Sequence, residues 1–225
     1  MNSTSDAALV GIWDVLFPGT PPWEIAFSPH GQFSYCAKDF SRITIGSWRL
    51  SPSSSVFPSI GTHTLRFYPT GPATPPDEVW NPSAWKEDEV SFGNGTLLER
   101  LDSRQATATE RVHVLGLLCG HLQDLDTRTA NLESRVHPLL QQLNILLGQH
   151  GFQPQSLCLQ LRAWYREFFA GLSPLESVAA QIGAGGITVL ANRIQREKAR
   201  RQHEFDVVEQ ILAHGSGSVA ELLRP

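Results

Sequence analysis

The composition of this chain changes sharply near residue 102, and the two sides of that break favour different kinds of structure. Residues 1–102 hold five of the six tryptophans and eleven of the fifteen prolines, whereas residues 103–225 are rich in leucine. Aromatic sequence punctuated by Gly and Pro favours strands, while Leu, Gln, Arg and Glu favour helices. We therefore expect an α+β protein, with a small antiparallel β-barrel over 1–102 and a helical domain over 103–225.

Bulk composition excludes several classes of protein. The chain has 225 residues, 41% of them hydrophobic, and a formal net charge of -4, which does not favour nucleic-acid binding. Its three cysteines show no CxxC spacing, and no motif for a metal or cofactor is present. With neither a signal peptide nor an apolar run of about 18 residues, we expect a cytoplasmic protein.

The first half of the chain reads as a series of short strands separated by turn residues. Eight segments are predicted as strands: 9–17, 23–27, 31–36, 44–50, 62–68, 77–80, 87–92 and 96–101. Several of them alternate between apolar and polar residues, which indicates one buried and one solvated face. So many short strands in such a compact stretch suggest a small barrel or sandwich.

The start and end of this region resemble the lipocalin-like family of small barrels. Gly11, Trp13 and, in "LLERL", Arg100 match that family's Gly-x-Trp and late arginine. The resemblance implies that Trp13 closes one end of the barrel and that Arg100 packs over its ring. A guanidinium can stack on an indole, so this arrangement is physically reasonable.

The remaining aromatic residues of this region have two possible roles. Some could line a cavity for a small apolar ligand, or they could fill the core. The ligand-binding candidates are Trp23, Phe33, Tyr35, Trp48, Trp80 and Trp85. Trp80 and Trp85 lie in a Pro-rich acidic segment, where they would be either exposed beside acids, suiting a protein partner or cationic ligand, or buried in a crossover.

A heptad pattern is the sharpest feature of the second half. Leucine fills each d position, and the a positions hold one polar residue, Thr129. The residues assigned to oligomerisation are Leu115, Leu118, Leu122, Leu125, Thr129, Leu132, Val136 and Leu139. This pattern predicts a coiled-coil helix over about 110–148 that contacts another chain. The alternative is that the stripe packs on the chain's own later helices, and Pro138 should end or kink the helix.

Further helices should follow, over 156–172, from a start at Ser173-Pro174, and from Ile187 onward. The Gly-rich stretch 183–186 lacks the residues of a phosphate loop. The basic run 193–201 is best explained as a solvated helix face, with RNA or a membrane surface less favoured.

These observations favour a non-enzymatic assembly or adaptor subunit. A coiled coil would join it to a protein partner or to a second copy, and the barrel would present a binding surface. The alternative is a lipocalin-like protein that binds a small apolar molecule, and an enzyme built on such a barrel is a third class. No catalytic residue and no cofactor are assigned.

Overall fold

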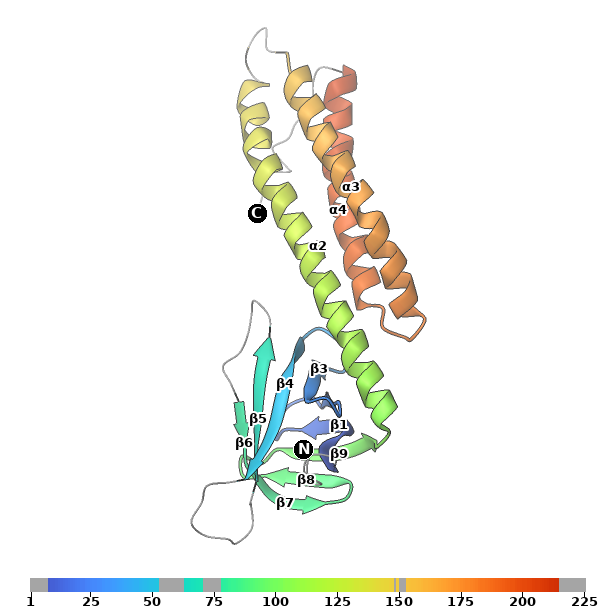
Figure 1. Cartoon of the computed structure of the whole chain (residues 1–225). Coiled ribbons are helices and arrows are strands. Elements are labelled where there is room, and N and C mark those ends of the chain that lie inside the picture. The colour runs from blue at the N-terminus through green and yellow to red at the C-terminus, as the bar shows by residue number, and fades with distance from the viewer. Residues whose placement is uncertain (1–7, 53–62, 71–77, 148, 150–152, 215–225) are drawn as a thin grey trace. The chain divides into compact units, whose positions relative to one another are not determined.

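A computed structural model describes residues 8–52, 63–70, 78–147, 149 and 153–214 (Figure 1). The chain divides into two compact units, Met1–Cys119 and Gly120–Pro225. A long helix, α2 (Gln105–Leu146), begins in the first unit and ends in the second. Each unit is described by itself below.

The first unit contains a nearly closed antiparallel barrel. Its strands follow the order β6-β5-β4-β3-β2-β1-β9-β8-β7, and each pairs antiparallel with its neighbour. The strands are β1 (Gly11–Leu16), β2 (Trp23–Phe27), β3 (Gln32–Ala37), β4 (Ile43–Pro52), β5 (His63–Thr70), β6 (Glu78–Trp80), β7 (Pro82–Lys86), β8 (Glu89–Phe92) and β9 (Leu97–Asp102). The expected α+β class and the N-terminal barrel are thus confirmed.

The described part of the chain has one strand more than the sequence predicts, because the segment that forms β7 is expected from the sequence as a loop or an edge. Its sequence, PSAWK, starts with proline and does not alternate clearly. It forms at the edge of the sheet, where proline is tolerated, and its register with β8 shifts between Pro82 and Ala84. The predicted starts of two strands, at residues 62 and 77, lie outside the described residues.

Asn81 brings the two edges of the sheet together. It is the single residue between β6 and β7, the first and last strands of the sheet order. Its side-chain oxygen accepts a hydrogen bond from Thr64 Oγ1 of β5 at 3.2 Å, and its carbonyl accepts one from the Gly93 amide after β8 at 3.1 Å. A single asparagine thereby connects the β5–β6 edge and the β7–β8 edge, between which the barrel is not fully closed. This limits the exposed strand edge.

The first turns of α2 pack on the outside of this barrel. Ala108 and Val112 form a small apolar cluster with Ile12 and Ala26, which point outward from β1 and β2. Beside it, Arg111 Nε lies 2.6 Å from the carboxylate of Glu24. The predicted boundary at residue 102 separates strands from helices, but the start of the helix packs with the strands.

The second unit is helical. The later part of α2 is joined there by α3 (Gln155–Gly183) and α4 (Val189–His214) (Figure 1). The predicted break at Pro174 is wrong, because Pro174 lies inside α3, and α2 also continues past Pro138. Apolar burial continues across both prolines, through Leu172 and Leu175 in one helix and Val136 and Leu140 in the other. Tertiary packing therefore outweighs the local cost of proline.

Candidate functional site

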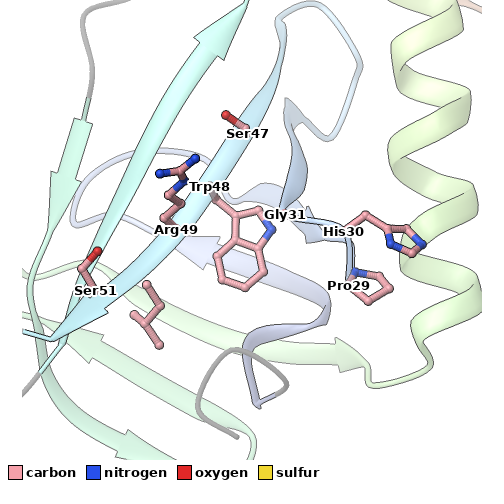
Figure 2. Close-up of a pocket in the computed structure, with 8 residues that line it drawn as sticks. Pro29, His30, Gly31, Ser47, Trp48, Arg49 and Ser51 are labelled. Atoms are coloured by element: carbon pink, nitrogen blue, oxygen red, sulfur yellow. The ribbon is translucent and has the colours of Figure 1, made fainter. Parts of the chain in front are cut away.

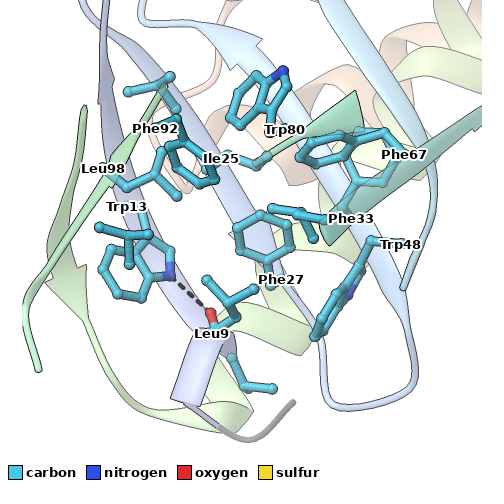
Figure 3. Packing of buried hydrophobic residues seen from close by; sticks show 14 residues of the cluster. Leu9, Trp13, Ile25, Phe27, Phe33, Trp48, Phe67, Trp80, Phe92 and Leu98 are labelled. Carbon is cyan, nitrogen blue, oxygen red and sulfur yellow. Dashed lines mark hydrogen bonds between the residues drawn. The ribbon is translucent and has the colours of Figure 1, made fainter. Parts of the chain in front are cut away.

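The end of the barrel near the N-terminus is closed by Trp13. Its ring is fully buried and its Nε1 donates to the Leu9 carbonyl at 2.8 Å (Figure 3). The guanidinium of Arg100 lies over the indole, and its Nη1 donates to the Val10 carbonyl at 3.1 Å. Burial lowers the pKa of Arg100, partly offset by nearby Asp88, yet arginine stays charged.

Gly11 is needed where the chain enters this closed end. Its φ is +146°, and a Cβ built there would lie 2.5 Å from the Asp102 carbonyl oxygen. Any larger residue would push apart β1 and β9, which pair with a register shift at this point. The three residues of the lipocalin-like pattern are therefore brought together at one end of the barrel.

The barrel interior is filled by its own side chains. Aromatic rings contact one another edge to face across it, including Phe67 with Trp80 at 4.7 Å and Phe27 with Trp48 at 5.1 Å between centroids (Figure 3). Of the six ligand-binding candidates, Phe33, Trp48 and Trp80 belong to this buried core. The other three, Trp23, Tyr35 and Trp85, are partly buried and pack against it.

A pocket of about 60 Å³ lies among the core side chains. Ile25, Phe33, Tyr35, Phe67 and Trp80 line it, and Glu78 accepts a hydrogen bond from Trp80 Nε1 at 3.2 Å. Burial, reinforced by the negative charge of Glu78, raises the pKa of Tyr35, so its hydroxyl stays protonated. Ligand pockets measure about 300 Å³ or more, so this space suits only a few water molecules.

A larger depression lies at the surface, between the turn 29–31 and the end of β4. It measures about 570 Å³ and is open to solvent. Its lining residues, drawn as sticks in Figure 2, are Pro29, His30, Gly31, Ser47, Trp48, Arg49, Leu50 and Ser51. Within the described part of the chain, the buried Nε1 of Trp48 has no hydrogen-bond partner. Polar groups dominate this depression, so it does not suit an apolar ligand.

One outer face of the barrel carries a row of four carboxylates. Glu24, Asp14, Glu99 and Glu89 lie directly opposite one another across β2, β1, β9 and β8. Arg111, Lys38 and Lys86 pair with three of these acids, at 2.6 to 2.8 Å. Glu99 sits between two like charges and forms no ion pair with another described residue. The sequence alone does not reveal this row, because only the strand register aligns its members.

The heptad residues of the second unit are buried within the chain itself. Leu125, Leu132 and Val136 are at most 4% exposed, while Leu122, Thr129 and Leu139 are half-buried. Leu115 and Leu118, in the first unit, are fully buried. In the second unit, the heptad stripe is therefore buried against the chain's own helices. This is the alternative to contact with another chain.

The basic run in α4 is largely engaged in ion pairs within its own unit. Arg193 pairs with Asp126 of α2, Lys198 with Glu176 of α3, and Arg201 with Glu133 of α2. These contacts neutralise the side chains that a nucleic acid or an anionic membrane would need. None of the described helices is long and apolar enough to cross a membrane.

Two of the three cysteines, Cys36 and Cys158, are buried thiols, and Cys119 is partly exposed. Burial raises the pKa of Cys36 to about 12 and that of Cys158 to about 11. Over the described residues, no group of three or more His, Cys, Asp or Glu side chains is placed to hold a metal ion.

Comparisons with family models, curated proteins and solved structures gave no match for this chain.

Proposed function

We propose that this protein is a non-enzymatic adaptor that binds another protein through the outer surface of its barrel. The observation that carries the proposal is the filled interior, where the described pocket of about 60 Å³ leaves no room for a substrate or ligand inside the barrel. The larger depressions of the first unit, about 570 and 540 Å³, are open to solvent on its outside. A barrel packed in this way is a rigid scaffold, and rigid scaffolds serve recognition through their surfaces. The lipocalin-like pattern of Gly11, Trp13 and Arg100 is consistent with such a scaffold.

The carboxylate row is the surface that best fits this role. Three of the four acids are paired with a cation, so among the described residues Glu99, directly opposite Asp14 and Glu89, is the carboxylate left for a partner's cation. Leu97 and Leu101 of β9 point to the same outer face as Glu99, and Leu101 is 53% exposed. Acids flanked by leucines would complement a partner segment that combines basic and apolar side chains.

Assembly through the heptad stripe is the less favoured form of this proposal. To pair with another chain, Leu125 and Leu132 would have to leave the contacts that now bury them. Exposing leucines costs about 1.5–3 kcal/mol for each side chain. A contact on the barrel surface needs no such rearrangement.

Affinity purification from the native host with a charge-reversed variant tests the proposal. We expect Glu99→Lys to lose a partner that the unmodified chain retains. Glu110→Lys is the matched control, because Glu110 is an exposed glutamate of α2 outside the row. If Glu99→Lys retains the same partners as the control, the carboxylate row is not the binding surface.

A small apolar ligand is the second candidate function, favoured by the stack of Trp23 on Tyr35, whose ring centroids are 4.7 Å apart beside the small pocket. Movement of this stack would be needed to admit a ligand. Titration with a fatty acid, followed by tryptophan fluorescence, should give no saturable change. A saturable change that the Trp23→Ala variant abolishes would favour this second candidate.

A further inference from the structure

A second face of the barrel places two arginines directly opposite each other. Arg49 of β4 and Arg66 of β5 are partners in the strand register. Their neighbours Trp48 and Phe67 are buried in the core, so the two arginines point outward. Figure 2 shows Arg49 on one side of β4 and the Trp48 ring on the other. Side chains at such opposed positions have Cβ atoms about 5 Å apart.

Among the described residues, neither arginine has a counter-ion. Within the described part of the chain, Arg49 and Arg66 form no ion pair and no side-chain hydrogen bond. By contrast, Lys38, Lys86 and Arg100 of the same barrel each pair with a carboxylate. Two guanidiniums held face to face without an acid repel each other, and an anion placed between them would relieve that repulsion.

Hydroxyl groups flank the arginines on both sides. Ser47 lies opposite Tyr68, and Ser51 lies opposite Thr64, in the register positions on either side of the arginine pair. By the alternation of the strands, all of these side chains belong to the same outer face. Thr64 Oγ1 already donates to Asn81, so the face offers two guanidiniums and the hydroxyls of the other three residues as donors, with no carboxylate among these six residues.

From this arrangement we infer that the Arg49–Arg66 face binds a phosphate group carried by a serine or threonine side chain of a partner protein. A phosphate monoester brings a charge of about -1.5 to -2 and three acceptor oxygens, which two arginines and neighbouring hydroxyls can satisfy together. A carboxylate has a single charge and two oxygens, so one arginine is enough for it.

The charge of the surrounding barrel selects for a single phosphate group. Residues 1–102 contain 6 Lys and Arg against 11 Asp and Glu, a net charge of -5. An extended polyanion, such as nucleic acid or an anionic membrane, would be repelled by the rest of this surface. A phosphorylated peptide contacts only the arginine pair and its rim, where Val79, 47% exposed, lies opposite Arg66.

This inference rests on the proposed function only in that the partner is a protein. The test is a nitrogen-15 NMR titration of the full chain at constant ionic strength. The probes are inorganic phosphate, a phosphoserine peptide and its unphosphorylated twin, and phosphatidylserine vesicles are tested separately by co-sedimentation. We expect both phosphate probes to shift the amides of residues 47–51 and 64–68, and the phosphopeptide to bind more tightly than inorganic phosphate.

Two variants and one control make the test specific. Arg49→Gln and Arg66→Gln should each weaken phosphopeptide binding about tenfold, which corresponds to one lost charge-assisted interaction. Arg42→Gln is the matched control, because Arg42 is an exposed arginine in the turn between β3 and β4. All three positions are on the surface, so unchanged amide spectra elsewhere should show that the fold is retained.

Three results would overturn the inference. They are the absence of shifts at the arginine pair with either phosphate probe, equal binding of the phosphorylated and unphosphorylated peptides, and equal weakening by Arg42→Gln. Binding to phosphatidylserine vesicles without binding to the phosphopeptide would assign the face to a membrane instead. The carboxylate row lies on other strands, so failure here leaves the outcome of Glu99→Lys unaffected.

Discussion

The central carbon of the Arg100 guanidinium lies 4.0 Å from the ring centroid of Trp13, and this contact joins the last strand of the barrel to the first. Arg100 also donates to the carbonyls of Ala8, Val10 and Glu87. The planar guanidinium stacks on the indole face while its fork of N–H groups donates outward, whereas a lysine ammonium has no plane to stack. One side chain thus covers the tryptophan and satisfies backbone oxygens at an end of the barrel where strand pairing stops.

Removing Trp13 should destabilise the barrel severely. Its ring is fully buried, and the change to alanine leaves a cavity and deprives Arg100 of its stacking partner. We expect Trp13→Ala to lower the free energy of unfolding by about 3–5 kcal/mol in denaturant melts. Trp85→Ala is the control, since Trp85 is only partly buried and should cost less. A loss under about 1 kcal/mol for Trp13→Ala would contradict the closed end described here.

A buried ionic cluster in the helical unit yields a second prediction. Arg201 is 3% exposed and contacts Glu133 and Glu204, and the Tyr165 hydroxyl donates to Glu204 at 2.9 Å. Arg201→Ala leaves the buried Glu204 carboxylate without its close cation, which should cost about 3–5 kcal/mol in chemical denaturation.

The neighbouring arginine supplies the control for that experiment. Arg200 is largely exposed and makes longer ion pairs, 3.5 Å to Glu133 and 3.8 Å to Glu204. Arg200→Ala should therefore cost less than about 1 kcal/mol. Equal losses for the two variants would show that Arg201 is as solvated as Arg200.

Thiol reactivity should separate the three cysteines. Burial raises the pKa of Cys36 and Cys158 to about 12 and 11, so almost no thiolate forms at pH 8 and reagents have no access. Burial also raises the pKa of the partly exposed Cys119 thiol. We expect slow labelling of Cys119 by a disulfide reagent in the native state, and of all three after denaturation, as mapped by mass spectrometry. Rapid native labelling of Cys36 would contradict the packing of β3.

Much of the fold could be predicted because local signals and packing agree. The composition break places the start of α2, at Gln105, within a few residues, and a short pattern locates Trp13 and Arg100 in the first and last strands. The sequence prediction differs from the structure at Pro174 and at β7, both because of proline. Burial outweighs the low helix propensity of Pro174, and β7 tolerates its proline because it lies at the edge of the sheet.

The two charged faces could not be predicted from the sequence. Glu99 and Glu89 are ten residues apart, and Arg49 and Arg66 are seventeen apart, so nothing local connects them. Only the register of β8 with β9, and of β4 with β5, makes them neighbours. Changing the register by one residue would place them on the opposite faces of their strands.

The heptad stripe provides the last prediction, since Leu125 and Leu132 are buried by the chain's own helices. Replacing both with Asp places two unpaired charges in that core, which is strongly unfavourable. We expect the helical unit to lose circular dichroism at 222 nm while the sedimenting mass stays that of a monomer. The near-ultraviolet signal of the barrel tryptophans should persist. Ile145→Asp is the control, because Ile145 is 67% exposed on the same helix and should leave the spectrum unchanged. An unmodified chain that sediments as a dimer, and that the double change converts to a folded monomer, would instead mean that the stripe joins two chains.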